Sequence, residues 1–193
     1  VSNSNEFGIS IHSSGMNRFN GIITEYNLNR SVLTGNHQNG NGLYMMDECA
    51  GSTIDNLTSR FNVNGISVGH DFGPATFTNS VLDSNQYGFI AHDSNVNLYR
   101  PSEITMENVT MSNNSISGAF IDFMVQGSPH DTEFNFFKNI TANNNTMYGI
   151  EFHGCNNTVS NSTFMYNSGG AFYFNSTENT FCNDENNTVV NST

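Results

Sequence analysis

Three side chains that can move protons or bind a metal recur at one position of a repeated segment. His92, Asp122 and His153 each stand four residues after a glycine, in three consecutive repeats. If the repeats stack as strands, neighbours in this row lie about 4.8 Å apart at the backbone. An imidazole beside a carboxylate can serve as general acid and base or as part of a metal site. A solvated polar row on the outside of a repeat fold has the same pattern, and both interpretations stay open.

A metal site needs more than this row, because ligands on an exterior surface lack the outer shell of hydrogen bonds that holds them in place. We therefore expect no bound metal and no cofactor, with calcium as the one ion that could be present. The glycines follow the period of the repeat and do not open helices, so a phosphate-binding glycine loop is also not expected.

The repeat that positions this row of side chains is defined by its asparagine and glycine residues. Each unit has two asparagines six residues apart, and a glycine followed by alternating apolar residues comes shortly after the second. Five units share this pattern: Asn56/Asn62/Gly65, Asn79/Asn85/Gly88, Asn108/Asn114/Gly118, Asn139/Asn145/Gly149 and Asn161/Asn167/Gly170. The glycines are spaced by 21 to 31 residues. A period of this size, with short strands between Asn/Gly turns, is typical of a solenoid.

The strands of this solenoid are expected to be very short. Segments such as Gly65–Val68 and Gly149–Phe152 alternate with period 2 and are rich in Ile, Val and Phe, and no stretch has a helical period. We predict an all-β chain, a single-stranded parallel β-helix of about seven to eight coils. Residues one and three after each glycine should point inward, and those two and four after it outward. Asparagine suits the corners, since it tolerates left-handed backbone and can form stacked amide ladders.

The whole chain, 1–193, is predicted to be one domain. The pattern is already under way at Asn5 and Gly8, and Val190–Thr193 opens another unit, so we expect a segment of a longer solenoid that could assemble end to end. Inserted loops are expected at about 12–20, 93–102 and 123–133. The last two follow the same strand position in neighbouring coils and would form a wall beside the row of His92 and Asp122.

Composition limits the partners of the protein. The net charge is −12, with only five Lys and Arg residues, which argues against nucleic acid and anionic membrane surfaces and counts against tight binding of a polyanion. No apolar run is long enough for a membrane-spanning helix. A polysaccharide or another glycan is the partner that fits best, with the exposed aromatic residues Phe120, Phe172 and Phe174 contacting sugar rings.

Cysteines and glycosylation sequons leave two interpretations each. Cys155 and Cys182 lie in neighbouring coils and could form a disulfide that leaves Cys49 unpaired, or all three could be buried thiols. Eleven Asn-x-Ser/Thr sequons occur, and in an extracellular or cell-surface protein several could carry glycans. Alternatively, an asparagine corner followed by a threonine in a strand creates sequons automatically. The expected glycosylation positions are Asn29, Asn56, Asn108, Asn139 and Asn161.

A family resemblance lies on these same residues. Tyr87–Asp93, with the sequence Y-G-F-I-A-H-D, resembles the Y-G-F-D-P-H-(D/E) signature of mannuronan C5-epimerases, right-handed parallel β-helix enzymes of the pectate lyase-like fold that invert uronate residues within alginate. Gly118–Val125 resembles the strand that carries a further active-site aspartate in that family. The resemblance implies that Tyr87 exchanges the C5 proton, that His92 is its acid/base partner and that Asp122 orients them. Ile90 and Ala91 stand where the signature has aspartate and proline.

An enzyme acting on an anionic sugar would also need cationic support, for which Arg60, Arg100 and the imidazole of His153 are the candidates. The rest of the resemblance is shared by Asn/Gly-rich repeats of carbohydrate-binding and sugar-hydrolase type. Two functions therefore stay open. The favoured one is an extracellular or cell-surface structural, carbohydrate-associated β-helix without catalysis; the alternative is a polysaccharide-active enzyme, an epimerase, lyase or glycoside hydrolase.

Overall fold

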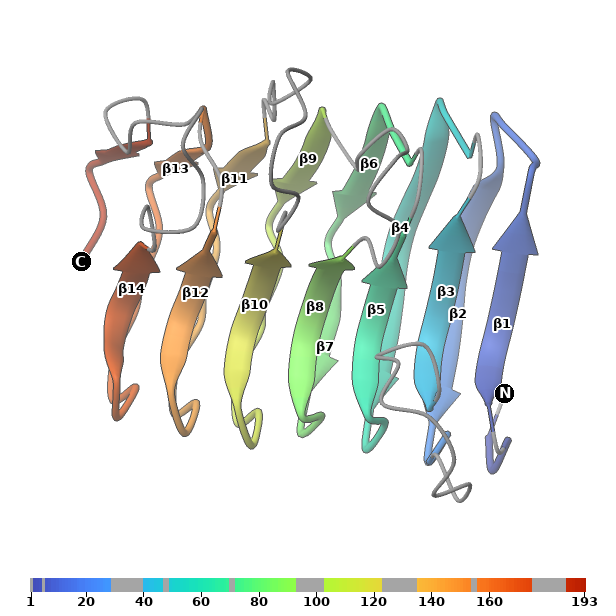
Figure 1. Cartoon of the computed structure of the whole chain (residues 1–193), viewed down its shortest axis with the longest axis horizontal. Coiled ribbons are helices and arrows are strands. Elements are labelled where there is room, and N and C mark those ends of the chain that lie inside the picture. The colour runs from blue at the N-terminus through green and yellow to red at the C-terminus, as the bar shows by residue number, and fades with distance from the viewer. Residues whose placement is uncertain are drawn as a thin grey trace.

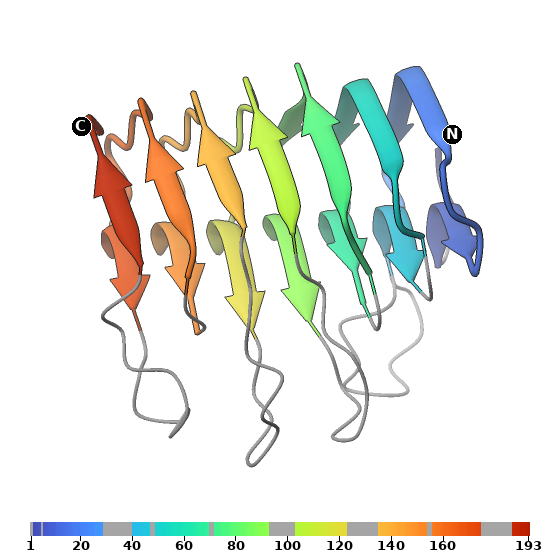
Figure 2. The same cartoon turned by 90° about the horizontal axis from the view of Figure 1, so that it is seen from above.

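The computed structural model describes residues 2–4, 6–28, 40–46, 49–69, 72–92, 103–122, 135–153, 156–174 and 187–193, with only the backbone of 92 and 122. Its strands form two parallel sheets, which face each other as two layers with the termini at opposite ends of the stack (Figures 1 and 2). In the described residues no helix is long and apolar enough to cross a membrane.

The front sheet, nearest the viewer in Figure 1, contains seven strands, and consecutive coils supply its neighbours. In spatial order they are β1 (Phe7–His12), β3 (Asn41–Met46), β5 (Asn64–Val68), β8 (Tyr87–His92), β10 (Ser117–Asp122), β12 (Tyr148–Phe152) and β14 (Gly170–Phe174).

The rear sheet receives one strand from each coil in the same order. Its strands are β2 (Arg18–Glu25), β4 (Ser52–Arg60), β6 (Ala75–Thr78), β9 (Ile104–Glu107), β11 (Phe136–Lys138), β13 (Thr158–Ser160) and β15 (Thr188–Val190). The short strand β7 (Val81–Asp83) pairs with the second half of β4, and single bridges continue this narrow side face through Thr110, Thr141 and Thr163. The predicted parallel β-helix is confirmed, with one coil turning around a front, a rear and a side face.

The core lies between the faces and has the predicted alternation. Residues one and three after the glycine are buried in the five inner strands of the front sheet, β3, β5, β8, β10 and β12, as at Phe89 and Ala91 in β8. The glycines themselves are required where coils approach closely: a Cβ on Gly65 would lie 2.4 Å from the backbone oxygen of Gly88. Phenylalanine rings contribute to this core through edge contacts, for example Phe77 with Phe89 at 5.9 Å between ring centroids.

A continuous ladder of buried asparagines forms the corner that leads into the front sheet. In each step the backbone N–H of one asparagine donates to the Oδ1 of the asparagine one coil later, at 2.9 or 3.0 Å. Most of the Nδ2 groups donate to backbone carbonyls of the coil before. The members are Asn27, Asn62, Asn85, Asn114 and Asn145, which are buried, and Asn167 at the C-terminal end, which is half-buried. The predicted amide ladder is thus confirmed. It supplies hydrogen-bond partners to backbone N–H and carbonyl groups at the turns that would otherwise be buried without a partner.

A second row of asparagines stands on the exposed corner between the rear face and the side face. Asn56, Asn108, Asn139 and Asn161 all have positive φ, between 50° and 57°, which asparagine tolerates better than most residues. The side chains form a ladder here too, since Asn139 Nδ2 donates to Asn108 Oδ1 at 3.0 Å. The fold therefore accounts for asparagine at these sequons, and their glycosylation stays a prediction; Asn29 lies outside the described residues.

The predicted inserted loops and two of the three cysteines lie largely outside the described residues. The connection between β1 and β2 is shorter than the predicted loop at 12–20, because His12 ends one strand and Arg18 begins the next. The loops predicted at 93–102 and 123–133 lie outside the described residues. The same holds for Cys155 and Cys182, whereas Cys49 is a buried free thiol whose Sγ donates to the carbonyl oxygen of Met46 at 3.0 Å.

Candidate functional site

The predicted row of His92, Asp122 and His153 is assembled as expected at the backbone. Asp122 is the partner of His92 in the pairing of β10 with β8. The backbone N–H of His153 donates to the carbonyl oxygen of Ile121 at 2.8 Å, which places it one coil further, just beyond β12. The three positions therefore lie side by side at the carboxyl ends of three front-sheet strands.

The side chain of His153 is paired within its own coil. Its Nε2 lies 2.9 Å from Oε1 of Glu151, and both side chains are only 13% exposed. Glu151 stands two residues after Gly149, at an outward position of β12. This imidazole–carboxylate pair can hydrogen-bond a ligand hydroxyl or transfer a proton. The sequence pattern located His153 but did not single out Glu151.

Aromatic rings connect this pair to neighbouring coils. The ring centroid of Phe120 lies 5.4 Å from that of Tyr87 and 5.2 Å from that of His153. Tyr173 stacks on Tyr148 at 4.9 Å and lies 5.9 Å from His153. We call these five residues the front aromatic patch. Its rings are at least partly exposed and come from β8, β10, β14 and from β12 with the residue that follows it, so the patch extends along the axis of the solenoid.

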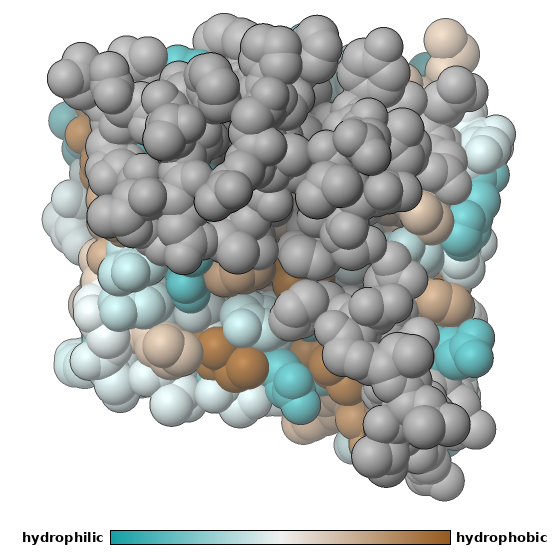
Figure 3. All heavy atoms as spheres, in the orientation of Figure 1, coloured by the Kyte–Doolittle hydropathy of each residue, from teal (hydrophilic) through white to brown (hydrophobic). Residues whose placement is uncertain are grey.

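Figure 3 looks onto the front sheet. Outside the residues drawn in grey, apolar side chains gather over the middle strands next to polar ones. Such a mixture of ring faces and hydrogen-bonding groups suits a ligand that is itself amphipathic.

Two aromatic residues predicted to contact sugar rings, Phe172 and Phe174, do not stand on the outward positions expected for them in the last coil, although Phe174 is 39% exposed. Phe172 aligns with Ile150 and Phe174 with Phe152, both buried residues of β12. Phe172 packs against the core, and Phe174 stacks on Phe152 at 5.6 Å between centroids. Neither residue belongs to the outward row, and the outward aromatic residue of this strand is Tyr173.

Phe172 and Phe174 align with inward residues because β14 is shifted by one residue relative to the register counted from Gly170. Tyr148 pairs with Gly170, so that Ala171 occupies the position that Gly149 has in β12. The buried ladder sets this register, because Asn145 and Asn167 are bonded to each other and the strand begins at the same distance from both. Counting from Asn167 would have identified Tyr173 in the sequence; counting from Gly170 missed it.

Ile90 occupies the centre of the predicted catalytic strand. It aligns with Phe120 and Ser67 at an outward position but is fully buried and lies outside the core cluster. The mannuronan C5-epimerase signature has an aspartate here. The middle of this strand therefore offers an inaccessible apolar side chain where the related signature has a carboxylate.

Of the groups expected to support an anionic substrate, His153 lies on this face but is paired with Glu151, and the described front strands have no arginine. Arg60 lies at the end of β4 on the side face, where it pairs with Glu25 and approaches the ring of Phe61; the corner at Phe61 separates it from the front sheet. Arg100 lies outside the described residues. None of the seven front-sheet strands contains Lys or Arg, and no group of three His, Cys, Asp or Glu side chains in the described ranges could hold a metal ion.

Comparison with known proteins identifies the fold. No protein-family model and no curated protein matches the chain. Among solved structures, the A-module of mannuronan C-5 epimerase AlgE4 from Azotobacter vinelandii is similar with a TM-score of 0.58 and 12% identity, over 94% of this chain and 54% of that one. The A-module of AlgE6 from the same organism gives 0.54 and 13%, over 94% and 58%. The chain thus spans little more than half of each module and shares with them the parallel β-helix fold.

Proposed function

We propose that this β-helix binds a neutral polysaccharide along its front sheet and catalyses no reaction on it. The observation that carries the proposal is the front aromatic patch, a row of partly exposed rings contributed by four successive coils. The C–H faces of sugar rings pack against aromatic faces, and their hydroxyl groups need hydrogen-bond partners. Glu151 and His153 are such partners at the centre of the patch.

Charge favours a neutral glycan over a uronan. A C5-epimerase or lyase has to offset the substrate carboxylate and stabilise an enolate-like intermediate. The described front strands contribute Glu151 and Asp122 and no Lys or Arg, so a polyanion would be repelled. The proposal includes a setting outside the cell or at its surface, where polysaccharides are met; the acidic composition and the fold shared with polysaccharide epimerase modules are compatible with it.

A uronan epimerase or lyase is the second candidate. It is favoured by the register of Asp122 with His92 and by the position of Tyr87 at the start of the same strand. This alternative requires proton transfer by Tyr87 and His92, which stand on either side of Ile90 in β8, with Asp122 as the orienting carboxylate.

Binding is tested by titrating the protein with neutral polysaccharides, such as mannan, xylan and cellulose oligosaccharides, and with polymannuronate. We expect binding to at least one neutral glycan and none to polymannuronate. Phe120→Ala and Tyr173→Ala should each weaken it about tenfold or more, as the loss of a well-packed aromatic contact does. The control is Tyr166→Ala, since Tyr166 is 80% exposed on another corner. Equal losses in the control, or no binding of any neutral glycan, would refute the proposal.

Catalysis is tested separately by incubating the protein with polymannuronate and mixed uronans in deuterated water. Proton exchange at C5 and new unsaturated ends are followed by NMR. We expect neither. Exchange that disappears in Tyr87→Phe would overturn the non-catalytic proposal and establish the second candidate.

A further inference from the structure

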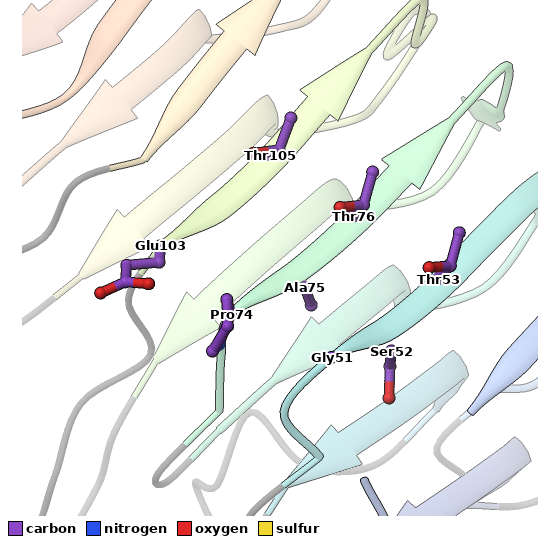
Figure 4. Close-up of a pocket in the computed structure, with 8 residues that line it drawn as sticks. All are labelled: Gly51, Ser52, Thr53, Pro74, Ala75, Thr76, Glu103 and Thr105. Carbon is purple, nitrogen blue, oxygen red and sulfur yellow. The ribbon is translucent and has the colours of Figure 1, made fainter. Parts of the chain in front are cut away.

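The outer face of the rear sheet carries a row of threonines on three neighbouring strands. Thr53, Thr76 and Thr105 are direct partners in the pairing of β4, β6 and β9. Figure 4 shows the three side chains in one line, with their hydroxyl oxygens on the same side. Adjacent strands of a sheet are about 4.8 Å apart, so the hydroxyl groups repeat at that distance along the axis.

These threonines form the floor of a hollow. Its volume is about 140 Å³, and its edge is formed by the residues that precede the three strands, Gly51, Pro74 and Glu103. A hollow of this size holds about four or five water molecules, or part of a small polar ligand in their place.

The hydroxyl groups of this row have no hydrogen-bond partner among the described residues, although their side chains are half-buried. The parallel row two residues later is different. There Asp55 accepts hydrogen bonds from Asn20 and Thr78, both at 2.8 Å, and Lys138 is paired with Glu107. The polar side chains of the later row are hydrogen-bonded to one another. The threonine hydroxyl groups, in contrast, are available to a polar ligand on the outer face.

Glu103 places a carboxylate at the rim of the hollow in an unfavourable backbone conformation. Its φ is 55°, in the left-handed region, where a residue without the small side chain of Asn or Gly is strained. The aligned residue two coils earlier, Gly51, has a φ of 73° and no such strain. The same conformation occurs at other corners of the coil, such as Tyr26 and Phe61, so what Glu103 adds to this hollow is its carboxylate at the rim.

An exposed aromatic ring continues the row. Phe136 follows Thr105 in the same outward column and is 46% exposed, while its neighbour Phe137 is buried in the core. At the other end the column begins with Arg18, the partner of Thr53. One cationic side chain, from Arg18, stands at the start of this row, and one anionic group, from Glu103, stands at its rim, so neither sign of charge predominates in the row.

We infer that the rear sheet contains a second saccharide site, in which a short neutral oligosaccharide lies along the axis over Thr53, Thr76 and Thr105 with one sugar ring on Phe136. The three strand steps from Thr53 to Phe136 measure about 14 Å, which accommodates a few sugar units. Glu103 accepts hydrogen bonds from sugar hydroxyls, and the threonine hydroxyls donate and accept. This site lies on the other sheet from the front aromatic patch and does not depend on ligand binding there.

The test is NMR of the full chain with labelled threonine methyl groups, titrated with cellohexaose, maltohexaose and mannohexaose. We expect at least one of these to shift the methyl signals of Thr53, Thr76 and Thr105. Glu103→Gly should weaken this binding about tenfold or more, the effect of losing a hydrogen bond to a charged group, while folding is retained because glycine relieves the strain. Phe136→Ala should weaken it as well.

The matched control is Thr188→Ala, which changes a threonine of the same column on β15 and should leave the affinity unchanged. Phe120→Ala should also leave it unchanged, which separates this site from the front patch. The inference is overturned if none of the three sugars shifts the signals, if the shifts persist in both Glu103→Gly and Phe136→Ala, or if calcium alone produces them.

Discussion

Replacing Asn85 with alanine removes one step from the buried asparagine ladder. Asn85 is 2% exposed and lies in the middle of the stack. Its Oδ1 accepts a hydrogen bond from the backbone N–H of Asn62, and its Nδ2 donates to the carbonyl oxygen of Ser59, both at 2.9 Å. Alanine at this position leaves both buried backbone groups without these partners.

The expected loss in the free energy of unfolding follows from those two groups. A buried backbone group left unpaired costs about 1–3 kcal/mol, and water entering the space of the lost amide would recover part of this. We therefore expect Asn85→Ala to reduce stability by about 2–4 kcal/mol. With a urea dependence near 2 kcal/mol per molar, the unfolding midpoint should fall by about 1–2 M.

Urea unfolding followed by circular dichroism measures this loss. Gln86→Ala is the matched control, because Gln86 is the next residue, is exposed and makes only backbone hydrogen bonds in the described contacts, which alanine keeps. It should change stability by less than about 0.5 kcal/mol. If Asn85→Ala is as stable as Gln86→Ala, the ladder does not contribute to the stability of the protein.

Three further predictions concern other parts of the coil. Gly65→Ala should destabilise the protein by about 1–3 kcal/mol, since its Cβ would lie 2.4 Å from the oxygen of Gly88; an unchanged urea midpoint would contradict this close approach. At Asn108, whose φ is 57°, the alanine variant should be less stable than the glycine variant by about 1 kcal/mol, and the reverse order would contradict a left-handed corner. Hydrogen bonds from Asn79 and Thr78 lower the pKa of Asp55. The stability that the Asp55 carboxylate adds, relative to Asp55→Asn, should therefore be present above the ordinary pKa of about 4 and be lost as the pH falls below that value. A stability difference that does not change with pH would show that these bonds do not favour the charged form.

The fold could be predicted because the sequence of each coil contains the residues that its own turns and close contacts require. Asparagine at a left-handed corner, asparagine in the buried ladder and glycine at the close approach all have local physical causes, and they recur at nearly constant spacing. Consistent local signals of this kind specify a solenoid without knowledge of distant contacts. The positions of His92, Asp122 and His153 followed directly from that spacing.

The composition of the site was predicted less well, since it depends on register between coils. Tyr173 was missed because Gly170, one residue before the aligned position, was taken as the strand glycine. Arg60 was placed near the front sheet because the bend at Phe61 between β4 and β5 cannot be located by period alone. Glu151 gave no signal, because a single acidic residue on an outward position looks like any solvated surface residue.

The buried ladder also gives the solenoid a direction. Every step has the same sense: the coil nearer the N-terminus donates its backbone N–H, and the coil nearer the C-terminus accepts with Oδ1. The backbone-to-side-chain hydrogen bonds of the ladder therefore all point the same way along the stack. A further coil of this kind can join the C-terminal end of the ladder only by offering an Oδ1, so two such stacks match head to tail and conflict tail to tail.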